Sequence, residues 1–113
     1  MTNLFVAADY DDGYAVWVNG IEVYRSAGLP PGPLEFNADP PSHESSNGTT
    51  PDYGAVIDIS SLGIPALVNG TNVLAVGVWN QIPTSPPSSD LGLVPKLSMN
   101  RLSTMTWRAN SSN

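Results

Sequence analysis

The sequence predicts an all-β protein built as an antiparallel β-sandwich. Short strand-like segments rich in Val, Ala, Tyr and Trp are separated by Gly, Pro, Asn and Ser, and the chain has no heptad or helical period. Eleven prolines and ten glycines among 113 residues favour turns over helices. This length suits one domain, so we expect residues 1–113 to form a single module.

The first three strands are expected around two tight turns. Residues 3–9 (NLFVAAD) form the first strand, and residues 13–20 (GYAVWVNG) follow after an acidic turn. The second segment ends in Asn19-Gly20, a dipeptide typical of type I′ turns. Residues 21–26 (IEVYRS) should therefore return as the partner strand.

The middle of the chain is expected to be irregular. Residues 28–53 hold six prolines, which exclude a helix or a central strand through most of the segment. A loop of this length in a small domain is either functional or disordered. The remaining expected elements are a strand at 55–60, a turn-rich connector at 61–70, a strand at 71–80, a polar loop at 81–90, and one or two closing strands within 91–102 and 103–110.

Two tryptophans stand among small residues on the expected outer faces of their strands. Because side chains alternate along a strand, Leu74, Val76 and Val78 face the core. Trp79 lies on the other face with Val73, Ala75 and Gly77. Trp17 stands in the same way beside Ala15. An indole with free space beside it suits stacking against a sugar ring. For Trp17 a second interpretation stays open, namely packing beneath the long loop as a satellite cluster.

Further candidate ligand residues flank these tryptophans. Asn80 and Gln81 follow Trp79 directly, and their side chains suit hydrogen bonds to sugar hydroxyls. Tyr10, Tyr14 and Tyr53 are the aromatic residues that turns and loops can add to the same site. Together with the tryptophans, they form the predicted carbohydrate-binding set.

Several stretches resemble a known family. The segments AADYDDGYAVWVNGIEVYRS, GLPPGP, LVNGTNVLAVGVWNQ and TSPPSSDLGL, within about residues 6–93, are similar to the galactose-binding-domain-like β-sandwich of secreted bacterial multidomain proteins. The resemblance implies a jelly-roll fold, a non-catalytic carbohydrate-binding module, an extracellular location and attachment to a glycoside hydrolase. It also implies a structural calcium ion, since many related jelly rolls hold one.

The predicted function is binding of a plant cell-wall β-glucan chain of the cellulose or xyloglucan kind by a monomeric module. Trp79 would stack a glucosyl unit, with Trp17 or a tyrosine as a second platform. The competing interpretation is a structural or protein-docking domain, whose tryptophans would lie under neighbouring domains.

The acidic turn is the candidate metal site. Asp9, Asp11 and Asp12 lie within four residues, and Asp90 comes from a second loop. Carboxylate oxygens of this kind suit Ca²⁺, although the EF-hand spacing is absent. The alternative is that these carboxylates accept hydrogen bonds from backbone N–H groups of turns.

Composition argues against other classes of function. The net charge is −6 with only four basic residues, so neither nucleic acid nor an anionic membrane is an expected partner. The chain has no cysteine, no GxSxG motif and only one histidine, His43. The side chains of Asp11 and Asp12 diverge on extended backbone and do not form an acid–base pair. We therefore expect no catalytic activity.

Overall fold

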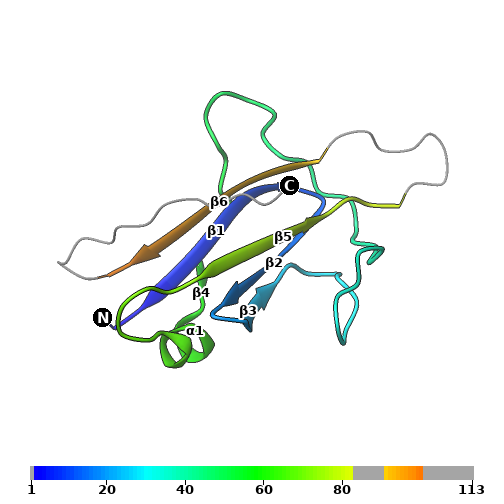
Figure 1. The fold of residues 1–113 in the computed structure, drawn as a ribbon. Helices are drawn as coiled ribbons and strands as arrows, with labels where there is room; N and C mark the ends of the chain where they lie inside the picture. Colours follow the sequence, from blue (N-terminus) through cyan, green and yellow to red (C-terminus); the bar gives the residue numbers. More distant parts are fainter. Residues whose placement is uncertain (1, 83–90, 101–113) are drawn as a thin grey trace.

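Two antiparallel β-sheets of three strands each make up most of the fold (Figure 1). The computed structural model describes residues 2–82 and 91–100. The sheets have the strand orders β4-β1-β6 and β3-β2-β5, and one short helix, α1, follows β4. The elements are β1 (Leu4–Asp11), β2 (Gly13–Val18), β3 (Ile21–Arg25), β4 (Ile57–Asp58), α1 (Ser60–Ala66), β5 (Leu74–Trp79) and β6 (Gly92–Met99). The described chain is thus mostly β, as the sequence predicts.

The first sheet is built on the long pairing of β1 with β6. The two strands are paired over their whole length, from Leu4 opposite Met99 to Asp11 opposite Gly92. By contrast, β4 pairs with β1 at only two positions, so the strand expected at 55–60 is shorter than predicted. Beyond Val6, the edge of β1 that faces β4 has no strand partner among the described residues, so residues of the long irregular segment can contact it. The closing strand expected within 103–110 lies outside the described residues.

The second sheet confirms the predicted hairpin. Asn19 and Gly20 both have positive φ, 50° and 83°, as a type I′ turn requires. On its other side β2 pairs with β5, from Gly13 opposite Trp79 to Val18 opposite Leu74. A register shift between Val16 and Trp17 interrupts the pairing of β2 with β3.

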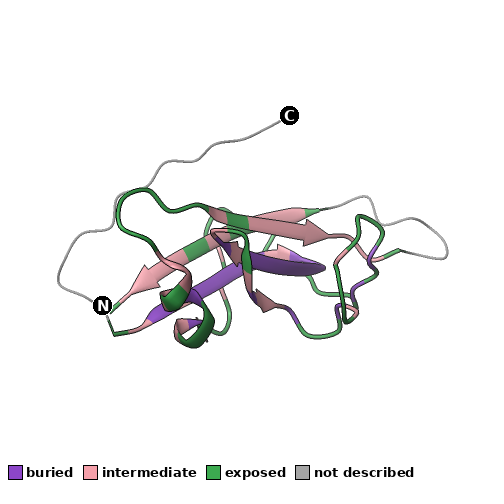
Figure 2. Ribbon diagram, turned by 60° about the horizontal axis from the view of Figure 1, so that its bottom comes forward, coloured by how far each residue is buried: buried purple, intermediate pink, exposed green. Residues whose placement is uncertain are grey.

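One hydrophobic core takes side chains from both sheets. The strands β1 and β2 are drawn largely in purple, the colour of buried residues, in Figure 2. Most buried members of the core come from alternating positions of these two strands: Leu4, Val6, Ala8, Tyr14, Val16 and Val18. Full burial of each large aliphatic side chain contributes about 1.5–3 kcal/mol. Leu74 and Val76 of β5 pack against this cluster, as the alternation in residues 71–80 predicts.

The helix α1 is a correction, since the sequence predicts only a turn-rich connector there. Its first turn is stabilised by Asp58, whose Oδ1 accepts a hydrogen bond from the Ser60 N–H at 2.9 Å. Gly63 allows the close approach to β1, because a Cβ at that position would lie 3.0 Å from Cδ2 of Leu4.

No helix in the described ranges is long and apolar enough to cross a membrane.

Candidate functional site

The predicted ligand residues lie in two separate places. Trp17 and Trp79 pack in a satellite cluster with Ala15, which is fully buried. Tyr10, Tyr14 and Tyr53 instead line a cavity. The sequence predicts one site, whereas the structure offers two that have to be considered separately.

The two tryptophans contact each other on the face of the second sheet opposite the core. Their ring centroids are 6.3 Å apart and the rings are tilted by 48°. The indole of Trp79 lies over Gly77, where a Cβ would meet its Cη2 and Cζ3 atoms at 2.8 and 2.9 Å. The space that the sequence predicts beside this indole is therefore filled by the indole itself.

Residues 27–39, here called the cover loop, pack over this pair. Leu29, Leu34 and Ala38 belong to the same satellite cluster as the tryptophans. The Nε1–H of Trp79 donates a hydrogen bond of 2.7 Å to the carbonyl oxygen of Glu35. Both tryptophans are half-buried, so each presents only part of its ring to solvent.

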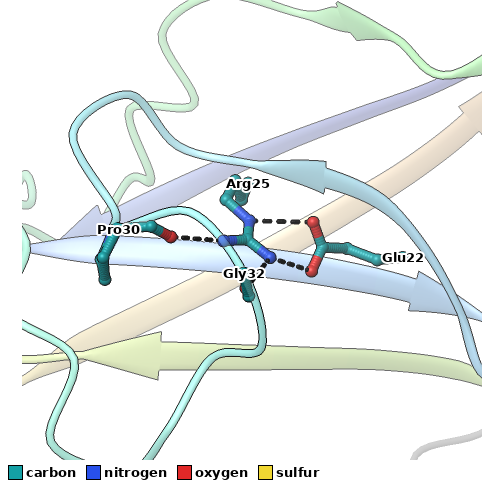
Figure 3. A network of polar contacts seen from close by, with 4 residues as sticks. All are labelled: Glu22, Arg25, Pro30 and Gly32. Carbon is teal, nitrogen blue, oxygen red and sulfur yellow. Dashed lines mark hydrogen bonds and ion pairs between the residues drawn. The ribbon is translucent and has the colours of Figure 1, made fainter.

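Arg25 fixes the start of the cover loop (Figure 3). Its Nε and Nη2 donate to the two carboxylate oxygens of Glu22 at 2.9 and 2.6 Å. The same guanidinium donates to the carbonyl oxygens of Pro30 and Gly32. The hydrogen bonds that Arg25 donates to Glu22 raise the pKa of its guanidinium. The bidentate fork to Glu22 orients the guanidinium along β3, and its bonds to Pro30 and Gly32 join this strand to the loop.

The second place is a cavity of about 320 Å³. One side of its lining comes from the strands β1, β2, β3 and β4. The rest comes from residues 43–55, here called the wall loop. All four tyrosines of the chain line it: Tyr10, Tyr14, Tyr24 and Tyr53.

Three of these tyrosines continue a row of rings that begins at His43. The imidazole of His43 stacks on the ring of Tyr10, with centroids 3.8 Å apart and planes inclined by 5°. The Tyr10 and Tyr14 rings follow at 4.6 Å, and the Tyr14 and Tyr24 rings at 5.4 Å. The Nδ1 atom of His43 also forms a hydrogen bond of 2.9 Å with the carbonyl oxygen of Tyr10. The row therefore connects an exposed loop residue to the protein core.

Tyr14 is the most deeply placed ring of the row. It is 3% exposed, and within the described residues its hydroxyl makes no hydrogen bond. Burial raises the pKa of Tyr14 well above the ordinary 10.0, and the neighbouring Tyr24 and Tyr10 hydroxyls raise it further. Three phenol groups thus lie close together beside the cavity in neutral form, where each is both a donor and an acceptor.

Polar side chains complete the cavity on the wall-loop side. They are those of His43, Glu44, Ser45, Ser46 and Asp52. The ammonium group of Lys96 lies outside this lining, 5.3 Å from the ring centroid of Tyr53. Acidic and basic groups therefore both border the cavity.

Asp9 anchors the wall loop. Its Oδ1 accepts a hydrogen bond from the Ser46 N–H at 2.8 Å. Its Oδ2 accepts from the Ser46 hydroxyl and from the Asp52 N–H, the latter at 3.1 Å. The Ser46 hydrogen bonds, above all that of the hydroxyl, hold the pKa of Asp9 below its ordinary value. This carboxylate is thus an acceptor for backbone and hydroxyl donors of the loop.

Asp12 has the same role at the beginning of the wall loop. Its Oδ1 accepts from the His43 N–H at 2.9 Å, and its Oδ2 accepts from the Gln81 N–H at 2.8 Å. Its own N–H donates to the carbonyl oxygen of Trp79 at 3.1 Å. One carboxylate therefore ties the cavity wall to the end of β5.

Within the described part of the chain, the acids of the turn act as hydrogen-bond acceptors. The oxygens of Asp9 and Asp12 already face N–H or O–H donors, and Asp11 is 2% exposed. Across residues 2–82 and 91–100, no three acidic or histidine side chains are grouped to hold a metal. Asp90 lies outside the described residues. Calcium binding therefore stays a prediction.

Asn80 and Gln81 follow β5 at the end where Asp12 lies. Gln81 contributes its backbone N–H to Asp12, and Asn80 is half-buried. In the sequence they directly follow Trp79 of the satellite cluster. The hydrogen bonds that Asp12 accepts from Gln81 and His43 connect them to the cavity wall. The role of their side chains toward a ligand stays a prediction.

Sequence reasoning missed Tyr24 and His43. Simple alternation in β3 puts Tyr24 on the same face as Glu22, but the irregularity opposite Trp17 changes this pattern. As a result Val23 and Tyr24 both reach the main core, while Glu22 and Arg25 pair with each other. His43 and Tyr10 are far apart in the sequence, so no local sequence pattern predicts that their rings stack.

Comparisons with protein-family models, with curated proteins and with solved structures found no match to this chain.

Proposed function

We propose that this protein is a non-catalytic carbohydrate-binding module with a jelly-roll β-sandwich fold. The carrying observation is the cavity of about 320 Å³, which combines four tyrosines with serine and carboxylate side chains. Aromatic rings provide surfaces for the C–H faces of a sugar, and the polar groups provide partners for its hydroxyls. Ligand pockets generally show this combination of apolar walls and a few placed polar groups.

A neutral glycan fits the charges around the cavity. Glu44 and Asp52 on the lining are accompanied by His43, and Lys96 lies over Tyr53. The mixture favours neither a strongly anionic nor a strongly cationic ligand. Cellulose and xyloglucan chains are the neutral glycans that we propose. Attachment to a glycoside hydrolase and secretion belong to the same proposal, and both rest on the family resemblance.

The proposed affinity is modest. Stacking of a nucleic-acid base on an aromatic side chain contributes about 1–3 kcal/mol. We expect a similar or smaller contribution from a sugar ring, which corresponds to micromolar or weaker binding when one or two rings take part.

A docking function is the second candidate, because Phe36 is 93% exposed. This residue lies in the cover loop, next to Glu35, whose carbonyl oxygen binds Trp79. A partner domain that buried Phe36 would also cover the tryptophan pair. This candidate uses the satellite cluster, whereas carbohydrate binding uses the cavity.

Affinity electrophoresis in gels that contain xyloglucan, hydroxyethylcellulose or polygalacturonate tests the proposal. We expect retardation in the two neutral β-glucans and none in polygalacturonate. Tyr53→Ala should reduce the retardation, since this half-buried ring lines the cavity. Trp79→Ala is the comparison variant, and loss of retardation only in this variant would move the site to the satellite cluster. Unretarded migration of the wild-type protein in both β-glucans would contradict carbohydrate binding.

A further inference from the structure

We propose that the tyrosine cavity recognises the end of a glucan chain by enclosing its terminal sugar ring. This inference rests on the proposed carbohydrate binding and makes it more specific. Binding to the interior of a glycan chain requires a groove that is open at both ends. Binding to the end of a chain requires only a pocket with one opening. The described residues place the cavity between the wall loop and the hydrophobic core, and this arrangement suits an end.

The floor of the cavity is formed by the core itself. Ala8 and Tyr14 line the cavity, and each is only 3% exposed. Both are members of the main hydrophobic cluster. A chain that enters beside the wall loop therefore meets packed side chains at this floor and cannot continue through it.

The wall loop lines the cavity together with the strands and is held in place by carboxylates. The carboxylate of Asp12 accepts a hydrogen bond from the N–H of His43. The carboxylate of Asp9 accepts hydrogen bonds from the N–H groups of Ser46 and Asp52. Three separate points of the loop are thus fixed to the first sheet and the adjoining turn. A preformed wall of this kind lowers the conformational cost of enclosing a ligand.

The size of the cavity also favours one sugar ring. Ligand pockets commonly span about 300–1,000 Å³. The value of about 320 Å³ lies at the lower end of that range. A terminal ring fits such a volume, while the next units of the chain would extend into solvent.

Tyr14 supplies the chemistry for recognising a terminal hydroxyl. Its hydroxyl makes no hydrogen bond within the described part of the chain, although the residue is 3% exposed. A terminal sugar has a free hydroxyl where an interior sugar has a glycosidic oxygen. A phenol that can both donate and accept gains more from the hydroxyl than from the ether-like oxygen. Sites that hydrogen-bond a ligand hydroxyl reject analogues that lack it.

The test compares chain ends with chain mass. Soluble xyloglucan is cut partially with an endoglucanase until the number of reducing ends doubles, while the mass concentration stays constant. Calorimetric titration with the full chain of this protein should then show that the binding capacity per gram doubles. A capacity that follows mass and ignores the number of ends would overturn the inference, while leaving carbohydrate binding itself intact.

Tyr14→Phe provides the residue-level test. The ring remains, so the melting temperature should be maintained, and affinity for cellotetraose should fall about threefold to tenfold, as expected for one lost hydrogen bond. Ile21→Val is the control outside the cavity, at an exposed position of β3, and should retain wild-type affinity. An unchanged affinity of Tyr14→Phe at wild-type stability would contradict the role of this hydroxyl. Lack of any binding of cellotetraose or xyloglucan by the wild-type protein would contradict the proposed function as well.

Discussion

Substitution of Gly77 by alanine should reveal how tightly Trp79 is packed. The added Cβ would lie 2.8 and 2.9 Å from two ring carbons of Trp79, closer than such atoms approach in folded proteins. The ring cannot move without consequences, because its Nε1–H is bound to the carbonyl oxygen of Glu35 and its neighbour is the ring of Trp17. We therefore expect Gly77→Ala to destabilise the protein.

Three contributions determine the magnitude. Alanine is favoured over glycine within a strand by about 0.5–1 kcal/mol. Overpacking costs about 1–3 kcal/mol, and loss of the Trp79–Glu35 hydrogen bond costs a further ~0.5–1.5 kcal/mol. The unfavourable contributions prevail, so the free energy of unfolding should fall by about 2 kcal/mol, which for a domain of this size lowers Tm by roughly 8 °C.

A double-mutant cycle separates the contact with Trp79 from every other effect of the substitution. Urea unfolding is measured for the wild type, Gly77→Ala, Trp79→Val and the double variant. In the Trp79→Val background the ring is absent, so Gly77→Ala should be neutral or stabilising by up to about 1 kcal/mol. Equal destabilisation in both backgrounds would refute the packing of this indole over Gly77.

Two further predictions concern pH and calcium. Burial raises the pKa of Tyr10, Tyr14 and Tyr24 above 10.0, so their contribution to stability is complete below pH 10.0 and is lost as the pH rises through the folded-state values. Phenolate absorbance should therefore increase at higher pH in the native protein than in urea, and coinciding curves would contradict the burial of these rings. Calcium binding by the acidic turn together with Asp90 predicts a lower Tm in EDTA than in excess calcium, since a ligand of the folded state stabilises by mass action. An identical Tm in both solutions would eliminate the calcium prediction.

The strands were predictable because their signals are local. Alternation of side chains identified the core faces of β2 and β5, and Asn19-Gly20 identified the hairpin between β2 and β3. The helix α1 was not predicted, because its apolar contacts with β1 and the bond from Asp58 depend on tertiary placement. Pro65 within the helix also made the segment look like a connector.

The division of the predicted site into two places was only partly predictable from the strands. Tyr14 and Trp17 lie on opposite faces of β2 by alternation, so the sequence already separated them. What it did not provide was the path of the long irregular segment. One part of that segment covers Trp79, and a later part forms the cavity wall beside Tyr10.

The acidic turn explains how an irregular segment can form a defined wall. The wall loop has no regular strand partner in the described part of the chain, so its backbone N–H groups need acceptors elsewhere. Asp9 and Asp12 provide these acceptors for His43, Ser46 and Asp52. Loss of either carboxylate would therefore release a part of the wall before it disturbed the core beneath it. The same residues that suggested chemistry in the sequence thus determine the shape of the cavity, and ligand binding should be sensitive to them without any direct contact.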